Sequence, residues 1–526
     1  MKRPTCPKCG KKMIKFTRKD GVIRWTCRET TGDKAYCYTT TDPEARYVRG
    51  QDGRRKGKTP IFKRTLGRST RRVIVTAAQN ATPVHGKFLK AIETACNYLN
   101  AEPLVVPLRY KNPTSRWTES QDNEEVWADE VQPYLCNQRK RLNRHLVLLA
   151  DVKTQPTAVS PLSGFEAITE GESGILAHTK LQLRCVPTPQ SRYPKLLTTT
   201  GAVTVPNYTD SKAGKLGEFH HCLGAALVEI DGKKFHLRQI NADKVTGEFY
   251  DLDKAYHPEH GVTNAGPALA LVMGDTHVDF IDKRVKQATF GAQGIVATLK
   301  PQYLVWHDLL DGYAVNPHRA NDPFTGIAKR QGDAQFIEQE VRRAAAFVQK
   351  HTPTGRRSVI VPSNHNDFLR RWVLNTDWRG DPDNAKFYLE TALAMAKGTK
   401  LTERGAEYPD PFVYWMEVLC LGRPNIRCLN TDESLMLARV EIGMHGDRGP
   451  NGSRGSIRNL RRIGVKSIIG HSHTPGIDEG CYQTGTSTPL RLEYNQGASS
   501  WLNTHCVLYA NGKRSLINII DGDWRI

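Results

Sequence analysis

The 526-residue sequence contains no long apolar run and no dense set of cysteines. No segment approaches the ~20 apolar residues that a membrane-spanning helix needs, so we expect no membrane partner. The N-terminus, MKRPTCPKCG, lacks the apolar segment of a secretory signal, which favours a cytoplasmic location. The 12 cysteines are spread thinly, and four of them lie near the N-terminus at metal-like spacing, which indicates a reducing compartment.

Acidic residues are also scarce relative to basic ones. The chain has 54 Asp and Glu against 75 Lys and Arg, a net charge of +21. Residues 1–72 alone hold 22 Lys and Arg against 6 Asp and Glu, or +16, which leaves +5 for the other 454 residues. A charge concentrated in this way is typical of a segment that binds a polyanion, the alternative being a merely soluble tail.

The N-terminal cysteines predict a structural zinc site. Cys6 and Cys9 form a CPKCG knuckle, and Cys27 and Cys37 would complete a four-thiolate site for one Zn²⁺. Between the pairs, apolar alternation around Asp20-Gly21 predicts a hairpin. Residues 1–43 therefore resemble a zinc ribbon. The nine residues between the second pair leave the fourth ligand open, and four unrelated cysteines are the alternative.

Residues 44–72 are basic, contain glycine and lack apolar periodicity. This composition predicts a flexible linker that orders on a phosphate backbone. With the ribbon it would form a nucleic-acid-binding arm, whose expected DNA contacts are Arg54, Arg55, Lys56, Lys58, Lys63 and Arg64.

The length of the remaining chain predicts further domains. In residues 73–262, VIVTAAQ, a helical stretch from about 83 to 100 and PLVVPLRY predict a β-α-β unit, and 174–250 are richer in short strands. We expect a separate α/β domain here that either shapes a substrate channel or mediates assembly, and a homo-oligomer.

A metal centre is predicted further along the chain. Six apolar residues, 268–273, predict a buried strand that leads through Gly274 to Asp275 and His277. Four later strand-like runs also end in polar side chains, and ligands gather at such ends in layered α/β folds. Mixed imidazole and oxygen ligands suit Mn, Fe or Zn, and seven suit two ions that share a carboxylate. The seven are Asp275, His277, Asp308, Asn364, His445, His471 and His473.

In this order the residues resemble the motifs of the calcineurin-like metallophosphoesterase superfamily, over about residues 268–510. The matching motifs are Gly274-Asp275-x-His277, Asp308-x-x-Asp311, Asn364-His365, His445 and Gly470-His471-x-His473.

The resemblance implies a four-layer β-sandwich flanked by helices, with two divalent ions, Mn²⁺ in the first place and Fe or Zn as alternatives. One ion would be held by Asp275, His277, Asp308 and His473, and the other by Asp308, Asn364, His445 and His471. His365, near the leaving group, and Asp311 would be the catalytic residues. Two such ions clamp an in-line displacement and lower the pKa of a bridging water, whose hydroxide attacks phosphorus.

The sequence departs from the family motifs at two places. His307 precedes the bridging Asp308, where the family usually has Gly. Asn366 follows His365, where the family has an acid, and Asp367 comes one place late. The carboxylate that would orient His365 is therefore not evident from the sequence.

The predicted fold class is α/β (α+β): a metallophosphoesterase domain at 263–526, with a helical insertion at about 366–438, preceded by an α/β domain and a zinc ribbon. The basic arm leads to the hypothesis of a metal-dependent DNA nuclease, similar in its catalytic domain to SbcD-type repair nucleases. A DNA-degrading nuclease encoded by a large tailed phage, acting in the host cytoplasm, is its specific form. The alternatives are a phosphatase or phosphodiesterase on small or protein substrates, and a non-catalytic DNA-binding regulator.

Overall fold

The computed structural model divides into two compact units, one of residues 1–62 with 124–126 and one of the remainder. In the first unit, β1 (Ile14–Thr17) pairs antiparallel with β2 (Ile23–Thr26), which confirms the predicted hairpin, and β2 pairs with β5 (Thr39–Thr40). A second pair is β3 (Thr30–Thr31) with β4 (Ala35–Tyr36). The structure describes residues 12–17, 23–26, 30–31, 35–36, 39–40, 71–109, 126–189, 193–317, 322–403, 405–493 and 495–526.

Two groups of predicted binding residues lie outside the described residues. They are the zinc ligands Cys6, Cys9, Cys27 and Cys37 and the DNA contacts Arg54, Arg55, Lys56, Lys58, Lys63 and Arg64.

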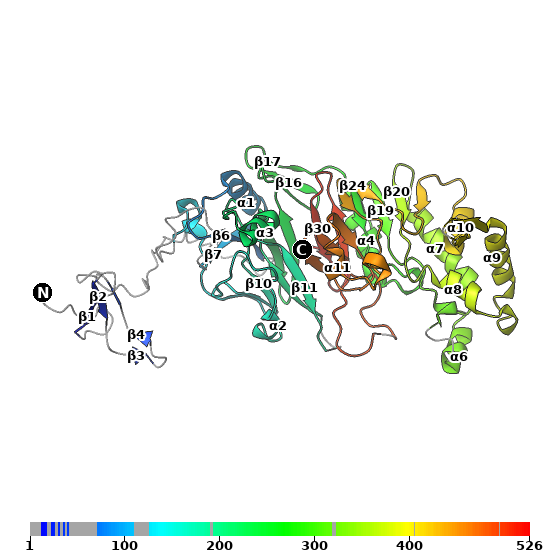
Figure 1. Ribbon diagram of the computed structural model, residues 1–526. Helices are drawn as coiled ribbons and strands as arrows, with labels where there is room; N and C mark the ends of the chain where they lie inside the picture. Colours follow the sequence, from blue (N-terminus) through cyan, green and yellow to red (C-terminus); the bar gives the residue numbers. More distant parts are fainter. Residues whose placement is uncertain are drawn as a thin grey trace. The chain divides into compact units, whose positions relative to one another are not determined.

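The second unit begins with the predicted β-α-β unit, formed by β6 (Arg71–Gln79), α1 (Gly86–Leu99) and β7 (Ala101–Leu108) (Figure 1). The pair is parallel, and β13 (Gly224–Asp231) and β14 (Lys234–Asn241) extend it to a sheet of order β14-β13-β6-β7. One face of this sheet packs against α1 through Phe88, Ile92 and Ala95. β6 is buried on both faces of the sheet, as strands of parallel sheets usually are, and this explains its nearly unbroken apolar run.

A ten-stranded sheet packs against this four-stranded sheet. It contains strands from both the N-terminal half (residues 71–262) and the C-terminal half (residues 263–526) of the unit, in the order β24-β25-β26-β28-β27-β11-β12-β10-β9-β8. Its N-terminal members are β8 (Lys140–Asn143), β9 (Leu146–Leu148), β10 (Ser173–Leu176), β11 (Gln182–Val186) and β12 (Lys195–Thr199). Its C-terminal members are β24 (Met436–Leu437), β25 (Val440–Glu441), β26 (Lys466–Ile469), β27 (Gly476–Asp478) and β28 (Cys481–Gln483).

A six-stranded sheet of order β23-β20-β19-β18-β29-β30 completes the C-terminal half. Its first four strands along the chain, β18 to β20 and β23, are parallel, and β29 and β30 form the hairpin predicted across Asn511-Gly512. The strands are β18 (Ala270–Val272), β19 (Tyr303–Trp306), β20 (Arg357–Ile360), β23 (Ile426–Cys428), β29 (Thr504–Leu508) and β30 (Arg514–Asn518).

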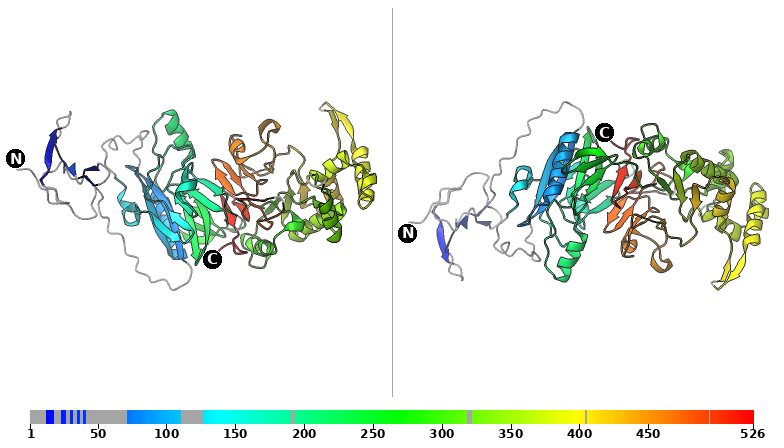
Figure 2. Two further views of the ribbon diagram at one scale, coloured as in Figure 1. Left: turned by 90° about the horizontal axis from the view of Figure 1, so that it is seen from below. Right: turned by 90° about the horizontal axis from the view of Figure 1, so that it is seen from above.

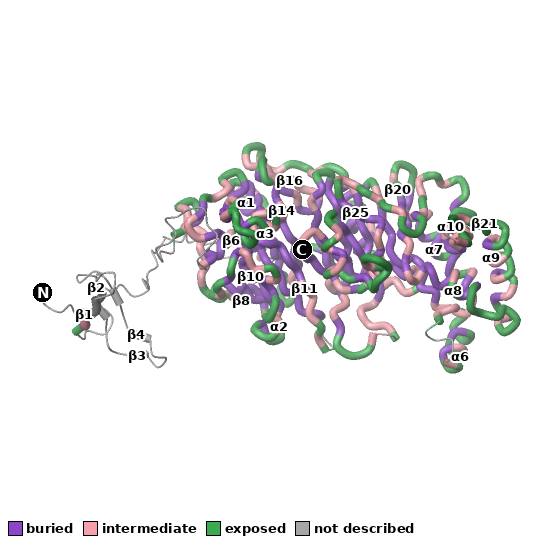
Figure 3. Tube along the Cα trace, viewed as in Figure 1, coloured by how far each residue is buried: buried purple, intermediate pink, exposed green. Residues whose placement is uncertain are grey.

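Helices cover the outer faces of these sheets (Figure 2). Trp306, Val341 and Leu369 belong to the cluster between the six-stranded sheet and its helices, and Leu460 packs on Ile469 on the far side. Four layers result, with the buried residues concentrated in the sheets (Figure 3). The helices are α4 (Lys283–Phe290), α5 (Ile295–Leu299), α6 (Pro323–Gln331), α7 (Ile337–His351), α8 (Phe368–Asn375), α9 (Ala385–Gly398), α10 (Pro411–Leu419) and α11 (Ile457–Leu460).

The remaining elements lie at the edges of this framework. The range 366–438 contains α8 to α10 and the hairpin of β21 (Lys400–Thr402) with β22 (Gly405–Glu407), whereas β23 and β24 of the same range join the sheets. The N-terminal half adds α2 (Phe165–Ile168), α3 (Lys212–His220) and a small sheet of β15 (Phe249–Asp251), β16 (Lys254–His257) and β17 (Gly261–Asn264).

The predicted α+β class is confirmed by these mixed sheets and their helices. Within the described part of the chain, no helix is long and apolar enough to cross a membrane.

Candidate metal centre

The predicted ligands stand directly after strands of both facing sheets. β18, β19 and β20 of the six-stranded sheet lead to Asp275, Asp308 and Asn364, and β25 and β26 of the ten-stranded sheet lead to His445 and His471. Both sheets present the C-terminal ends of these strands at one edge, where ligands gather in layered α/β folds.

The backbone at the centre adopts uncommon conformations. Positive φ angles occur at His277 (41°), Asp308 (41°), His471 (75°) and His473 (57°). Such angles are sparsely populated for residues other than glycine and cluster at functional sites, because the surrounding structure must hold them. The turn at Gly274 is fixed by its N–H, which donates to His505 Nδ1 at 2.9 Å.

Four of the predicted ligands form a first group. His277 Nε2 lies 3.2 Å from His473 Nε2 and 3.8 Å from Asp308 Oδ2, and His473 Nε2 lies 3.2 Å from Asp275 Oδ2. All four residues are buried. This is the set that the resemblance to the metallophosphoesterases assigns to the first ion.

A second group shares Asp308 with the first. Asn364 Oδ1 lies 3.1 Å from His445 Nε2 and 3.0 Å from His471 Nδ1. His445 Nε2 also lies 3.2 Å from Asp308 Oδ2. The structure thus brings together all seven predicted ligands, with Asp308 Oδ2 next to a histidine nitrogen of each group.

Gly470 makes room for Asp275. A Cβ at position 470 would lie 2.4 Å from Asp275 Oδ1 and 3.2 Å from Cγ of His307. The backbone N–H of His471 donates to the same Asp275 oxygen at 3.2 Å. Glycine is therefore required here by the carboxylate it faces, as the close approach of a backbone demands.

The charges of the centre are strongly coupled. Burial raises the pKa of Asp275 to about 7, against the opposing effect of the His445 imidazole. Burial also disfavours the charged form of Asp308, but the imidazoles of His445 and His365 hold its pKa well below its usual value. Despite burial, the Asp308 carboxylate raises the pKa of His445 to about 9. Asp308 is thus the anionic group around which both sets of imidazoles are arranged.

These residues fit a pair of divalent ions. The buried oxygens Asp275 Oδ2 and Asp308 Oδ1 accept no hydrogen bond from any described residue, although His473 Nε2 lies 3.2 Å from Asp275 Oδ2. A buried carboxylate oxygen without a donor is costly unless a cation compensates it. Histidine nitrogens with carboxylate and amide oxygens suit Mn, Fe or Zn better than Mg or Ca. Buried groups of His and Asp with ligand atoms within 4.8 Å of one another are Asp275-His307-His445, His277-Asp308-His365 and Asp275-Asp308-His473.

His365 is oriented by the main chain of Asp311. Its Nδ1–H donates to the Asp311 carbonyl oxygen at 2.8 Å, which leaves Nε2 available to a substrate. The carboxylate of Asp311 lies 3.0 Å from His277 Nδ1 and 4.0 Å from His365 Nδ1. Asp311 therefore positions two histidines, as the outer partners of metal-site histidines do. Asp367 binds Arg370 and Arg371 at 2.6 and 2.8 Å and takes no part in this arrangement.

Two further histidines lie beside the ligands: His505, to which the sequence assigns no role, and His307, which the sequence marks as either a substrate contact or a structural residue. His505 accepts from Gly274 and lies 2.9 Å from the Thr289 hydroxyl. His307 Nδ1 lies 3.1 Å from His445 Nδ1, and burial beside His445 lowers the pKa of His307 to about 3. A His445 that binds metal through Nε2 carries its proton on Nδ1 and can donate it to a neutral His307. A histidine in place of the family's glycine was the only sequence signal.

We expect His307→Ala to weaken Mn²⁺ binding ~10–100-fold, the usual effect of losing an outer partner of a ligand. His307→Asn keeps an acceptor near the position of Nδ1 and should retain most of the affinity. Calorimetric titration of metal-free protein with Mn²⁺ measures both variants. Equal affinity in wild type and His307→Ala would contradict the positioning role.

A cavity of about 910 Å³ opens beside the centre. Asn364, His365 and His471 line its inner end, and Phe280, Tyr313 and Phe368 contribute aromatic rings to its wall. Arg454, from the segment after His445, lines it as well and is exposed. That segment, residues 446–465, holds five arginines and one aspartate.

Fold and site together define an α+β protein with a buried cluster of His and Asp side chains that could bind metal ions. No family model matches the chain. Protein A1 of Escherichia phage T5 is 32% identical to it over 466 residues, which cover 86% of this chain and 82% of the phage protein. The chain therefore belongs to the family of this phage protein.

Proposed function

We propose that the protein is a metal-dependent nuclease that hydrolyses phosphodiester bonds of DNA. The observation that carries the proposal is the pair of ligand groups that share Asp308 and open onto a cavity with an aromatic wall and Arg454. When bound, two divalent ions, Mn²⁺ in our proposal, would lower the pKa of a water between them and offset charge on the phosphoryl group.

The residues of the centre have distinct tasks in this proposal. Asp308 holds both ligand groups together, and neutral Asn364 limits the negative charge that faces an anionic substrate. His365, fixed by the Asp311 carbonyl through Nδ1–H, would act in its imidazolium form, which also carries a proton on Nε2 and gives it to the departing oxygen. Because its ring is held by the backbone, its direction is set before the substrate arrives.

The surroundings of the centre favour a nucleic acid over a small ester. Bases stack on aromatic side chains at ~1–3 kcal/mol each, and Phe280, Tyr313 and Phe368 line the cavity. Arg448, Arg454, Arg458 and Arg462 are exposed on the segment beside the metal ligands. Arginines at such positions bind phosphates that flank the bond to be cleaved.

Linear and circular duplex DNA incubated with the protein and Mn²⁺, or with EDTA, test the proposal. We expect cleavage with Mn²⁺ and none with EDTA. DNA binding without Mn²⁺-dependent cleavage would favour the non-catalytic regulator. Hydrolysis of bis(p-nitrophenyl) phosphate without cleavage of DNA would favour a phosphodiesterase on small substrates.

Arg454→Ala should raise the KM for DNA about tenfold, because a charged hydrogen bond to phosphate contributes ~1.5–3 kcal/mol. The kcat should change less, since Arg454 lies at the wall of the cavity and outside both ligand groups. Steady-state cleavage of an oligonucleotide measures both constants, with the exposed Arg379→Ala as control. An unchanged KM would remove Arg454 from the substrate-binding surface.

Neutralising the six basic residues of the N-terminal arm should weaken DNA binding and flatten its salt dependence. On duplex DNA, the slope of log K against log salt becomes shallower by ~0.9 for each phosphate that the protein no longer neutralises. Hydrolysis of bis(p-nitrophenyl) phosphate should persist. The arm variant changes Arg54, Arg55, Lys56, Lys58, Lys63 and Arg64 to Gln, and a control changes six exposed residues, Arg330, Arg342, Lys350, Lys386, Lys397 and Lys400. An equal slope in both variants would mean that the arm is not the DNA-binding segment.

A further inference from the structure

The N-terminal half of the second unit repeats the strand order of the half that carries the metal centre. Its sheet β14-β13-β6-β7 corresponds to β30-β29-β18-β19, and its strands β8-β9-β10-β12-β11 correspond to β24-β25-β26-β28-β27. In each half, the two strands of this sheet that come first along the chain are parallel, β6 with β7 and β18 with β19. A later hairpin, β13 with β14 or β29 with β30, then pairs antiparallel with the first of them. In both second sets the directions also agree pair by pair.

The registers allow single residues to be equated. Ile175 of β10 pairs with Thr198, and Ile468 of β26 pairs with Tyr482. Carried along the chain, this places the segment LAHTK (176–180) on IGHSH (469–473) and TGA (200–202) on TGT (484–486). An independent contact agrees with this alignment, because Ala202 bridges in parallel to Ala77 and Leu223 just as Thr486 bridges to Asp275 and Asn503.

The layers around the sheets agree as well. Phe88 and Ile92 of α1 pack on the outer face of β6 and β7, where α4, α5 and α7 cover β18 and β19. Leu149, Leu162 and Leu176 form a cluster with Phe165 of α2 on the outer face of β9 and β10, where α11 covers β26. Each half is therefore a helix-sheet-sheet-helix sandwich.

Most of the metal ligands have no equivalent in the N-terminal copy. Ala77 stands at the place of Asp275 and Lys180 at the place of His473, while His178 still matches His471. β7, the counterpart of β19, ends in Val105-Val106-Pro107-Leu108, with no carboxylate. Ala177 replaces Gly470, and its Cβ is tolerated because the carboxylate that excludes a Cβ at position 470 is gone. Among the described residues, every group of His and Asp side chains placed to share an ion lies between 275 and 473.

The place of the lost site is filled by the chain itself. His178 Nε2 donates to the Gln155 carbonyl at 2.9 Å and its Nδ1 accepts from the Lys180 N–H at 2.9 Å. The Thr179 hydroxyl donates to the Pro156 carbonyl at 3.1 Å, and Lys180 Nζ donates to the Val159 carbonyl at 2.6 Å. His178 is fully buried, and burial lowers its pKa to about 4. Residues 155–159 thus cover the position that opens to the cavity in the other copy.

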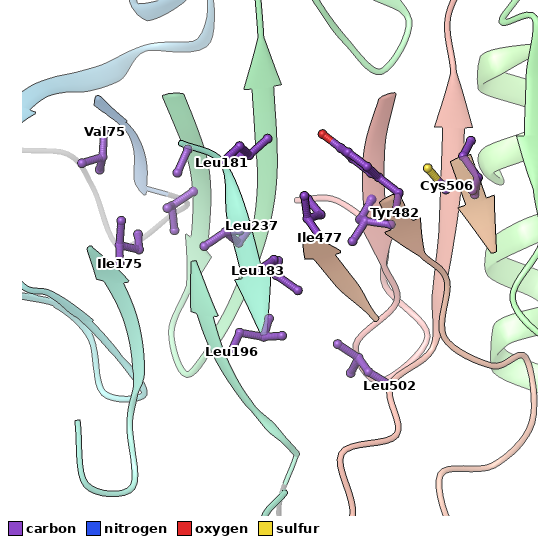
Figure 4. Close-up of a cluster of buried hydrophobic side chains, with 14 of the residues drawn as sticks. Val75, Ile175, Leu181, Leu183, Leu196, Leu237, Ile477, Tyr482, Leu502 and Cys506 are labelled. Atoms are coloured by element: carbon purple, nitrogen blue, oxygen red, sulfur yellow. The ribbon is translucent and has the colours of Figure 1, made fainter. Parts of the chain in front are cut away.

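The two copies meet through equivalent strands. β11 pairs antiparallel with β27, and the pair Leu183–Ile477 joins two residues that the registers equate. β14 contacts β30, its own counterpart. Side chains of both copies form one continuous core, with Leu183 and Ile477 among them (Figure 4). Self-pairing of equivalent elements is the pattern of a twofold interface between identical subunits.

We propose that residues 71–262 are a second copy of the metal-binding fold that holds no metal and occupies, within one chain, the place of the second subunit of a twofold dimer. The copy pairs the edge strand β27 and covers β30, and unprotected strand edges would otherwise associate with another chain. One metal centre then serves the whole particle. The proposal does not depend on what the centre hydrolyses.

Metal counting tests the loss of the second site. Metal-free protein is titrated with Mn²⁺ and bound Mn is counted by electron paramagnetic resonance, because a thiolate site takes Zn in preference to Mn. We expect two Mn²⁺ per chain in wild type and in His178→Asn, and none in Asp308→Ala or Asp308→Asn. If His178→Asn does not fold, Mn²⁺ is counted in Lys180→Gln in its place. If Asp308→Ala still binds Mn²⁺ and His178→Asn does not, the proposal is overturned. If the wild-type protein binds no Mn²⁺, the proposed function is overturned.

The mass of the particle in solution tests whether residues 71–262 take the place of a second subunit. Light scattering during gel filtration of the full chain should give 59.0 kDa, the mass of one chain, at micromolar concentration. The sequence led us to expect a homo-oligomer, and a stable two-chain particle would support that expectation and overturn the proposed internal dimer. This measurement remains informative even if no DNA cleavage is found.

Discussion

Replacing Asp308 by Asn or Ala will abolish Mn²⁺ binding at both positions and reduce DNA hydrolysis about 10³-fold or more. Its Oδ2 lies 3.2 Å from His445 Nε2 and 3.8 Å from His277 Nε2, one histidine from each ligand group. Losing one preorganised group that stabilises transition-state charge already lowers kcat by ~10²–10³. Losing the shared carboxylate removes the support of both ions at once.

Two other variants distinguish this effect from a general loss of stability. Asn364→Ala should weaken only the group formed with His445 and His471, so that one Mn²⁺ per chain remains. Asp282→Ala removes the N-terminal cap of α4, where Asp282 accepts from the Arg284 and Val285 N–H groups. It should lower the free energy of unfolding by ~1 kcal/mol and leave two Mn²⁺ bound. Two Mn²⁺ bound to Asp308→Ala would refute the shared role.

The cluster of candidate metal ligands could be predicted from the sequence because these residues follow buried strands. A strand followed by a polar pair, as at Asp275 and His277, places the pair at an edge of the sheet whatever the details of packing. The ligand groups then required only that five such strands face one edge, which layered folds provide. The α+β class followed from the same strands and from the helical stretches between them.

The orientation of His365 could not be predicted, because it depends on a backbone carbonyl from another loop. The sequence suggests a missing acid next to His365, and only the fold shows that the Asp311 carbonyl replaces it. The contact between His307 and His445 joins residues 138 positions apart and likewise has no local signal. The spacing of apolar and polar residues along the sequence does not predict side-chain contacts that depend on tertiary packing.

The internal repeat was missed for a related reason. The copies share short segments such as AHTK and GHSH, and the substitutions that removed the ligands also removed the motif. Residues 73–262 have no equivalents of Asp275 and His473, so a search of the sequence for metal-ligand motifs does not find the repeat there. Strand order and register remained, because the core of the joint sandwich requires them.

His365→Ala will lower kcat for DNA cleavage by ~10²–10⁴-fold and leave two Mn²⁺ bound, because its expected task is proton transfer. The variant should lose far less activity on bis(p-nitrophenyl) phosphate, since p-nitrophenolate is a weak base that departs without a proton. A deoxyribose oxygen is a strong base and needs one. The ratio of the two losses therefore reports acid catalysis, whereas an effect on metal binding would lower both rates alike.

Asp367→Ala is the matched control for His365, because it removes the acid that stands one place after the position of the family's acid. In the structure Asp367 binds Arg370 and Arg371, and the Asp311 carbonyl holds the imidazole. We therefore expect kcat of Asp367→Ala within about threefold of wild type on both substrates, a change below ~1 kcal/mol in the barrier. A loss as large as that of His365→Ala would mean that the carboxylate acts on the histidine after all. Equal losses of His365→Ala on DNA and on the activated ester would instead assign His365 to metal binding, where it already lies close to His277 and Asp308.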